Sequence, residues 1–376
     1  MKLNLKNQSK TVATYLIAAA TSATLFTACS RTPDPTPAGP YINGVFVMNF
    51  GNFSQNNGSL SWLTRMGSTA ETNIFETRNR RPIRGGIQSY VEAGNRGVIL
   101  VDNSTAGADK IEIVTADSLR SVKTLGAPDI ENPRYAVRIS DTKVYVTCWG
   151  TTGTFPNTFV NPGYVAVIDL TTNTVTKKIP VQKGAEGITL AGNEAYIAST
   201  DFSGSNVLTV IDTQTDVVKQ QILLPADVNK LQLDADSKLW AFAGKNAIRI
   251  NPFTKSIEAT IPVGLASNAS RPGNLTPSTD RRSMYYTYTN TDAAFRAVGQ
   301  VHRFSITDAS ITPTTPVVSR SFVGITGLGI DPKANVIYTG VTPSFAQAGL
   351  VYRHQTTGQL VDSVKVEISP VGFFFK

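Results

Sequence analysis

Aromatic and amide side chains recur in the polar, glycine-rich loops of this sequence, and these residue types suit a binding surface. Flat rings provide apolar contact area, and neighbouring amide and guanidinium groups provide hydrogen bonds to a large, partly apolar ligand. Each ring could instead cap the end of its own strand pair, but five such loops in one chain favour a shared site. The candidate ligand-binding residues are Phe50, Asn52, Phe53, Gln88, Trp149, Phe159, Phe202, Arg271 and Asn274, of which Gln88 and Asn274 are expected deepest.

A short connecting segment carries a cluster of four arginines, Arg78, Arg80, Arg81 and Arg84. Such a cluster can pair with phosphate or carboxylate groups, because each guanidinium offers a planar set of hydrogen-bond donors. A solvated loop beside a membrane surface would have the same composition. The sequence leaves both interpretations open.

Residues suited to catalysis or metal binding are sparse. The two histidines, His302 and His354, lie far apart in strand-like segments, and no spacing of histidine, cysteine and carboxylate residues is typical of a metal centre. No Ser/His/Asp order, phosphate-binding glycine loop or paired-carboxylate motif stands out. We therefore expect a protein that is not an enzyme, with no catalytic residue, no metal and no resident cofactor.

The elements that must position the candidate residues are repeated β-strands. In segment 163–199, GYVAVIDLTTNTVTKKIPVQKGAEGITLAGNEAYIAS, apolar residues alternate with a period of two around tight polar turns, as expected of antiparallel strands. The strand that opens this segment has six further copies. They begin at Leu60, Lys110, Leu208, Ala247, Val301 and Leu350.

A second repeated strand sets the period of the fold. Its copies begin at Gly44, Gly97, Lys143, Glu194, Lys238, Ser283 and Asn335, about 44 to 53 residues apart, which is the length of a four-stranded propeller blade. The first copy lacks a strand in front of it, whereas PVGFFF at residues 370–375 is left over at the other end. The sequence therefore predicts an all-β, seven-bladed β-propeller, closed by pairing of the C-terminal strand with the N-terminal blade.

This topology predicts which face of the propeller carries the ligand. Loops between the second and third strands share one face with the connections between blades, whereas the short turns between the third and fourth strands lie on the opposite face. The long, aromatic loops therefore gather on one face, where we expect the binding surface. Trp149 opens the longest of them and is expected to reach across the mouth.

The N-terminal residues resemble a targeting segment. Residues 1–28 have a lysine-containing start, a short apolar run and small residues before Cys29, as in a signal peptide. FTAC at residues 26–29 resembles the lipobox of bacterial lipoproteins, which implies lipidation of Cys29; the alternative is a secreted protein cut near Ala28. Residues 29–40 then form a Pro-rich tether, and residues 41–376 the propeller. Without the leader lysines the formal charge falls from +8 to +5, so no nucleic-acid partner is expected.

The repeats VYVTCWG (144–150) and EAYIAS (194–199) resemble those of the YVTN and YncE-like seven-bladed β-propellers. The opening segment GVFVMNFGNFSQNNGSLS (44–61) and the motif NPRY (132–135) are similar to a lipoprotein branch of that family, and the resemblance covers nearly all of residues 41–376. Branch members are surface lipoproteins that capture cobalamin and related corrinoids for a TonB-dependent outer-membrane transporter. This sequence departs from the branch at Phe50, where glutamate is common, and in the arginine-rich connection.

The resemblance implies a non-catalytic cell-envelope lipoprotein that binds a corrinoid or another large nutrient and partners with such a transporter. Its lipid anchor would lie in the outer membrane, with the propeller at the cell surface or on the periplasmic side. Two alternatives stay open at this point: a periplasmic enzyme of the lactonase or quinoprotein oxidoreductase type, and a surface adhesin. The enzyme would need convergent carboxylates or histidines in the central funnel.

Overall fold

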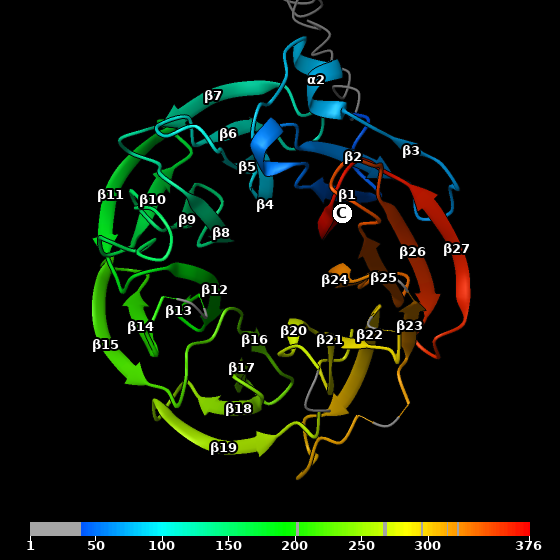
Figure 1. The fold of residues 1–376 in the computed structure, drawn as a ribbon. Coiled ribbons are helices and arrows are strands. Elements are labelled where there is room, and N and C mark those ends of the chain that lie inside the picture. Colours follow the sequence, from blue (N-terminus) through cyan, green and yellow to red (C-terminus); the bar gives the residue numbers. More distant parts are fainter. Residues whose placement is uncertain (1–38, 201–202, 266–268, 295, 314, 322) are drawn as a thin grey trace, which may run out of the picture. The chain divides into compact units, whose positions relative to one another are not determined.

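The computed structural model describes residues 39–376, except 201–202, 266–268, 295, 314 and 322. Gly39–Lys376 is one compact unit. Seven four-stranded antiparallel sheets follow one another around a ring as the blades of a propeller (Figure 1). Within the described residues no helix is long and apolar enough to cross a membrane.

Each blade runs from an inner strand to an outer one. Blade 1 contains β28 (Pro370–Phe375), β1 (Val45–Asn49), β2 (Ser59–Leu63) and β3 (Ala70–Glu71). Blade 2 contains β4 (Gly86–Ala93), β5 (Arg96–Asp102), β6 (Lys110–Thr115) and β7 (Ser121–Gly126). Blade 3 contains β8 (Pro133–Arg138), β9 (Lys143–Cys148), β10 (Tyr164–Asp169) and β11 (Thr174–Pro180). Blade 4 contains β12 (Ala185–Ala191), β13 (Glu194–Ser199), β14 (Val207–Asp212) and β15 (Val217–Leu223).

The remaining blades follow the same order. Blade 5 contains β16 (Gln232–Leu233), β17 (Leu239–Ala243), β18 (Asn246–Asn251) and β19 (Ser256–Pro262). Blade 6 contains β20 (Gly273–Pro277), β21 (Ser283–Thr291), β22 (Ala297–Ser305) and β23 (Val318–Ser321). Blade 7 contains β24 (Ile325–Ile330), β25 (Val336–Val341), β26 (Leu350–Gln355) and β27 (Leu360–Lys365). Two short helices, η1 (Phe53–Gln55) and α2 (Ile74–Asn79), lie in the loops of blade 1.

The core lies between neighbouring blades, so the middle strands bury both of their faces. In β9, Val144 and Val146 pack with blade 2, whereas Tyr145 packs with Val165 and the residues of blade 4. The outer strands bury one face only, and β11 alternates buried Ile179 with exposed neighbours. This difference explains why the second strands read as continuous apolar runs in the sequence.

The C-terminal strand closes the ring, as the sequence predicted. β28 pairs antiparallel with β1, with Val45 opposite Phe375 and Val47 opposite Phe373. The ring of Phe374 meets Tyr90 of blade 2 edge-on, with their centroids 4.9 Å apart. Phe373 and Phe375 turn to the other side and pack against blade 7.

Blade 1 departs from the repeat at its outer edge. Its fourth strand, β3, has only two residues, and α2 follows it. Ile74 and Phe75 of α2 are buried in the core that blades 1 and 2 share, and the side chain of Asn79 donates to the carbonyl oxygen of Leu119. The sequence shows no helical periodicity because one turn and a half is too short to produce it.

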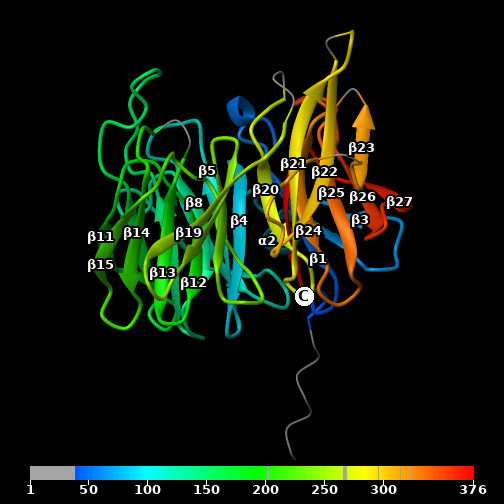
Figure 2. The same cartoon turned by 90° about the horizontal axis from the view of Figure 1, so that it is seen from below.

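The two faces of the propeller differ in the way that the topology requires. The hairpin of β21 and β22 rises above one face, which also carries the other long loops between second and third strands (Figure 2). The chain enters at the opposite face, where the backbone N–H of Tyr41 donates to the carbonyl oxygen of Asp117 in the turn between β6 and β7. The start of the propeller unit and the long loops therefore lie on opposite faces.

Ring closure makes Phe374→Ala a destabilising change. The substitution removes a half-buried ring from the contact between blades 1 and 2, so we expect the free energy of unfolding to fall by about 2 to 4 kcal/mol in a denaturant titration. Phe253→Ala is the matched control, because this ring is 91% exposed in a turn and should change stability by less than about 0.5 kcal/mol. Equal unfolding midpoints for the two variants would contradict a role of β28 in closure.

Candidate functional site

β-Bulges near the start of the inner strands aim side chains at the centre of the ring. A bulge places extra residues on one strand and re-aims their side chains, and it is a frequent device beside functional sites. The register shifts in six of the seven described inner strands, and β16 of blade 5 is the exception. The residues within these shifts are Gln88, Arg134, Tyr135, Glu186, Gly187, Asn274, Leu275, Thr326 and Val371.

The inner strands enclose a central channel of about 550 Å³. Gln88, Tyr135, Asn274 and Thr326 from four different bulges line it. Apolar side chains from β24 and β28 also line it. The channel therefore presents both hydrogen-bonding groups and apolar surface to a ligand.

A second pocket of about 380 Å³ lies on the long-loop face and opens onto the channel. Arg134, Glu186 and Arg271 line this mouth pocket, and their positions precede or begin inner strands. The mouth pocket and the channel share the residues Tyr135, Lys230, Asn274 and Leu275. The two spaces therefore form one continuous recess, within the size range of ligand-binding sites in proteins.

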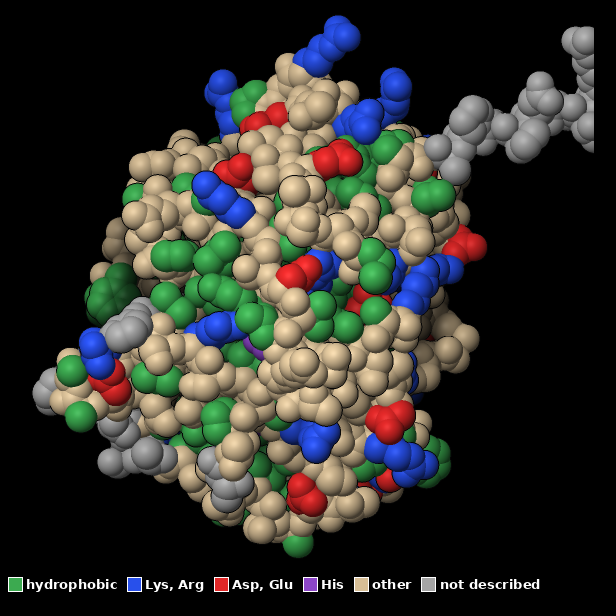
Figure 3. Space-filling model, turned by 90° about the vertical axis from the view of Figure 1, so that its right-hand side faces the viewer, with side chains coloured by type: hydrophobic (Ala, Val, Ile, Leu, Met, Phe, Trp, Pro, Cys, Tyr) green, Lys and Arg blue, Asp and Glu red, His purple; other side chains and the backbone are tan. Residues whose placement is uncertain are grey.

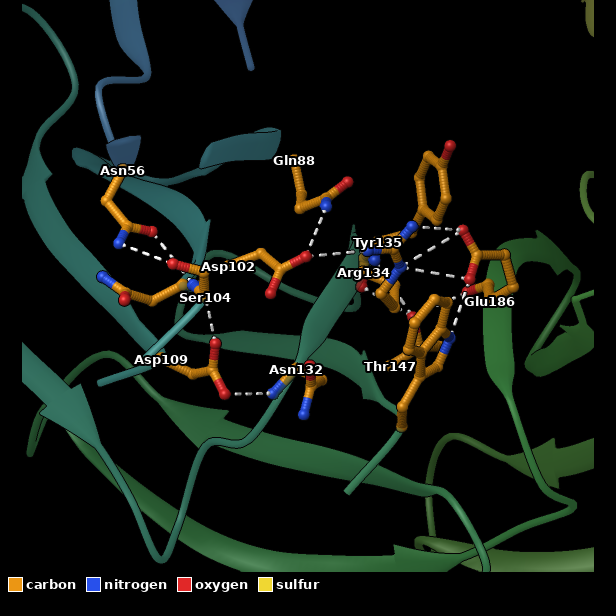
Figure 4. Close-up of polar contacts among 12 residues, drawn as sticks. Asn56, Gln88, Asp102, Ser104, Asp109, Asn132, Arg134, Tyr135, Thr147 and Glu186 are labelled. Atoms are coloured by element: carbon orange, nitrogen blue, oxygen red, sulfur yellow. Dashed lines mark hydrogen bonds and ion pairs between the residues drawn. The ribbon is translucent and has the colours of Figure 1, made fainter. Parts of the chain in front are cut away.

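Arg134 is the centre of the polar network at this mouth (Figure 4). Its Nη1 atom lies 3.2 Å from Oδ2 of Asp102, and its Nε atom lies 3.1 Å from Oε2 of Glu186. The guanidinium also lies 4.1 Å from the ring centroid of Trp149, whose indole N–H donates to Glu186 at 2.8 Å. Burial alone would lower the pKa of Arg134, but the carboxylates of Glu186 and Asp102 raise it above its usual value.

Backbone contacts fix the two strands that carry Arg134 and Glu186. The Thr147 hydroxyl accepts from the N–H of Tyr135 at 3.0 Å and donates to the carbonyl oxygen of Glu186 at 2.6 Å. This single side chain therefore joins the bulges of blades 3 and 4. The arrangement holds the ion pair in one geometry before any ligand arrives.

Two carboxyl groups support the network from behind. Gln88 donates to Asp102 at 2.9 Å, and Asp109 accepts from the backbone N–H groups of Asn103 and Asn132 (Figure 4). Burial raises the pKa of Asp109 to about 6, and the nearby Asp102 adds to the rise. Asn132 has a positive φ of 49°, and its backbone bond to Asp109 fixes the start of β8 just before Arg134.

Three of the sequence-predicted residues line this recess. Gln88 and Asn274 line the channel, and Asn274 and Arg271 line the mouth pocket. Trp149 lies behind the pocket wall, against Arg134 and Glu186, and Phe159 packs edge-on against Trp149 with ring centroids 5.0 Å apart. Trp149 therefore supports the wall through the residues that line it and does not itself reach across the mouth, in contrast to the expectation from its loop.

The other predicted residues lie elsewhere. Phe50 and Phe53 stack on one another with ring centroids 6.2 Å apart, and Asn52 donates to the carbonyl oxygen of Phe345 at 3.1 Å. These contacts join the loops of blades 1 and 7, and the three residues line neither the channel nor the mouth pocket. Phe202 and Cys29 lie outside the described residues.

Sequence reasoning missed most residues of the recess, among them Arg134, Tyr135, Glu186 and Lys230. Arg134 and Tyr135 belong to the NPRY motif at residues 132–135, which indicated the family resemblance but was not assigned to the binding site. Glu186 and Lys230 occur in ordinary strand-like segments, and nothing in the local sequence marks them as site residues. Glu186 and Lys230 become site residues only because neighbouring blades pack together around the recess.

Two arginines of the cluster, Arg78 and Arg81, make contacts that stabilise the fold. Arg81 forms two hydrogen bonds, of 3.0 and 2.9 Å, with the buried carboxylate of Glu112, and Arg78 donates to the Tyr41 hydroxyl at 3.2 Å. These contacts attach α2 and the chain entry to the blades. The interpretation as a phosphate site gains no support at Arg81, because its guanidinium is already paired.

The fold and the site define a seven-bladed β-propeller with a ligand-sized recess on its axis. Residues 43–376 match the model of one family, and the chain belongs to that family, which is described as Domain of unknown function (DUF5074). No curated protein matches the chain.

Three solved structures illustrate the shared fold. A quinonprotein alcohol dehydrogenase-like protein from Bacteroides thetaiotaomicron is 14% identical, with a TM-score of 0.63 over 89% of this chain and 78% of that one. Hydrazine synthase from Kuenenia stuttgartiensis is 15% identical, with a TM-score of 0.55 over 76% and 88%. The Pan2 WD40 domain from Neurospora crassa is 13% identical, with a TM-score of 0.52 over 77% and 82%. At these identities the likeness concerns the fold alone.

Both histidines are buried in third strands, away from the recess. Burial lowers the pKa of His302 to about 4, and burial together with the charge of Arg320 lowers the pKa of His354 to about 4. On the flank shown in Figure 3, histidine atoms reach the surface only at a small spot. Among the described residues, no group of three histidine, cysteine or carboxylate side chains could hold a metal ion.

The buried histidines predict loss of stability in acid. Their pKa values in the folded protein lie below the unfolded value of about 6.5, so the unfolded state takes up protons first as pH falls. This stability is present above pH 6.5 and is lost towards pH 4, at up to about 3 kcal/mol per histidine. His302→Phe, which keeps a ring against Tyr288, should flatten the decline in unfolding free energy over this range.

Subtracting the unfolding free energy of His302→Phe from that of the parent at each pH cancels the contribution of titrating groups that both proteins contain. Asp109 is one of them, and it acts in the opposite sense, because a raised carboxyl pKa makes stability fall as pH rises from about 4 to 6. Denaturant titrations at several pH values between 4 and 7 measure the difference. Parallel pH profiles for the two proteins would show that His302 does not titrate as described.

Proposed function

We propose that this protein is a non-catalytic, lipid-anchored binding protein of the cell envelope that captures a corrinoid or another large nutrient. The observation that carries the proposal is the continuous recess on the axis of the ring, which joins a mouth pocket of about 380 Å³ to a channel of about 550 Å³. A broad ligand would cover the mouth, and a smaller substituent would extend into the channel. Hydrogen-bonding groups from several blades would fix its orientation.

The position of the chain entry supports delivery from a membrane anchor. Tyr41 is attached to the turn face, whereas the recess opens on the long-loop face. A tether that leads from a lipidated Cys29 to the turn face would leave the recess pointing away from the membrane. That orientation suits capture of a nutrient and its transfer to a TonB-dependent outer-membrane transporter, with the propeller at the cell surface or on the periplasmic side.

The second candidate is an enzyme of the quinoprotein oxidoreductase type. Its support is that one structural neighbour is described as a quinonprotein alcohol dehydrogenase-like protein. A quinoprotein needs charged groups that contact its cofactor, and Arg134 with Glu186 would be the candidates here. These two groups already satisfy one another and Trp149, which favours a role in shaping the wall. A surface adhesin would use the exposed loop rings instead, such as Phe155 and Phe345.

Isothermal titration with a cobalamin, haem and a glycan panel tests the ligand class. We expect a cobalamin to bind and Trp149→Ala to weaken its binding by about 2 kcal/mol or more, because the variant releases Arg134 and Glu186 from their fixed positions. Phe253→Ala, on the turn face, is the control and should bind as the parent does. Circular dichroism must show both variants folded.

Each outcome of this titration has a meaning. Parental affinity in a folded Trp149→Ala variant would place the ligand away from the recess. A glycan that binds with loss of affinity in Phe155→Ala would favour the adhesin. Turnover of an alcohol with an added quinone cofactor would favour the enzyme.

Lipid anchoring has its own test in Cys29→Ser expressed with the native leader. Serine cannot form the thioether, so we expect the variant to move from the membrane fraction to the soluble fraction on cell fractionation. Cys148→Ser, at the buried second cysteine, is the matched control and should stay with the membrane. Unchanged membrane partitioning of Cys29→Ser would remove the lipoprotein proposal and leave the binding proposal intact.

A further inference from the structure

Lys230 is the only charged residue among the described residues that line the central channel. The other lining side chains are apolar, or are uncharged hydrogen-bonding groups such as Gln88, Thr189 and Gln232. Lys230 also lines the mouth pocket, so its ammonium group lies at the junction of the two spaces. From this we infer that the ligand carries an anionic group, a carboxylate or a phosphate, that enters the channel and pairs with Lys230.

The backbone holds Lys230 at this junction. The N–H of Gly187 donates to the carbonyl oxygen of Asn229 at 2.9 Å, and the Thr189 hydroxyl donates to the carbonyl oxygen of Leu231 at 2.7 Å. A Cβ atom at position 187 would overlap the Asn229 carbonyl oxygen, so only glycine allows this close approach of blades 4 and 5. Strand β12 of blade 4 therefore holds the residues on both sides of Lys230.

The contacts of the Lys230 side chain leave its charge uncompensated. Its Nζ atom donates to Oδ1 of Asn274 at 3.0 Å and lies 5.3 Å from the ring centroid of Tyr135. Asn274 is fixed in turn, because its Nδ2 donates to the carbonyl oxygen of Thr326 at 3.2 Å. Within the described part of the chain, Lys230 makes no ion pair with a carboxylate.

Asp227 and Glu186 line the mouth pocket with Lys230, but no ion pair joins either of them to Lys230 in the described part of the chain, and Glu186 serves another cation. Glu186 and Asp102 both pair with Arg134, and Glu186 also accepts from the indole N–H of Trp149. Arg134 is thus neutralised by the protein, whereas Lys230 has only an amide oxygen and a ring. An ammonium group carries three N–H donors, so donors remain for a ligand oxygen. Where a bound ligand excludes water, a charge-assisted hydrogen bond to an anion is stronger than one to a neutral group.

This inference rests on the proposed function, because it concerns the same recess, and it specifies that the ligand is anionic. A test that reports on Lys230 itself distinguishes failure of the anionic subsite from failure of the proposed function. The probes are benzoate and phenyl phosphate, which are aromatic anions, and benzamide, which has nearly the shape of benzoate without its charge. Lysine enriched in ¹³C at Cε and incorporated during expression gives each side chain an NMR signal and leaves all three N–H donors in place.

We expect benzoate and phenyl phosphate to shift the Lys230 signal in a saturable manner, and benzamide to leave it unchanged. Lys123, exposed on the outer strand β7, is the internal control for general effects of added salt. Lys230→Met identifies the signal and should weaken benzoate binding about tenfold or more, whereas Lys230→Arg should retain most of it. The relative affinities of the two anions distinguish a carboxylate from a phosphate.

Equal shifts of the Lys230 and Lys123 signals would overturn the inference, and so would equal effects of benzoate and benzamide. Folding of Lys230→Met is checked by circular dichroism, and the Lys230→Arg variant keeps the test decisive if the methionine variant does not fold. Saturable benzoate binding without any binding of a cobalamin would support the anionic subsite and contradict the corrinoid proposal. Binding of a cobalamin that Lys230→Met leaves unchanged would contradict the subsite alone.

Discussion

The pairing of β28 with β1 is the interaction on which the rest of the structure depends. Each blade of a ring packs against two neighbours, and an unclosed ring would expose the edge of β1 and two apolar faces. β28 provides both contacts, because Phe374 faces blade 2 and Phe375 faces blade 7. It also brings Val371 to the channel wall. The recess is therefore completed only by the last residues of the chain.

Within the closed ring, the bulges decide what the axis can bind. A regular inner strand would present alternate side chains at fixed heights, whereas a bulge adds residues where the strand begins. Arg134 and Glu186 occupy two such bulges in adjacent blades and meet over Trp149. A buried ion pair of this kind contributes little net stability, because desolvation offsets much of the attraction, but losing one partner leaves an uncompensated charge. Its physical role is to fix the wall in one geometry.

The sequence predicts the strands and the closure well, since period-two patterns and a missing partner strand are local signals. From topology the sequence places the candidate site on the long-loop face, and three of the candidate residues, Gln88, Arg271 and Asn274, line the recess. The helix α2 escapes detection because six residues show no period. Arg134 and Glu186 are 52 residues apart and meet only through blade packing, so no local pattern joins them. Composition likewise cannot separate Phe50, which stacks on Phe53, from a ring that lines the recess.

Two of the cations in the recess wall, Arg134 and Lys230, differ in whether a carboxylate compensates their charge, and this difference links the size of a ligand to its charge. Arg134 is paired with two carboxylates. Lys230 has no such partner among the described residues, so hydration must compensate its charge while the mouth is open to solvent. A broad ligand that covers the mouth removes part of that hydration and raises the free energy of the bare ammonium group. A ligand large enough to seal the recess therefore binds well only if it brings an anionic group to Lys230.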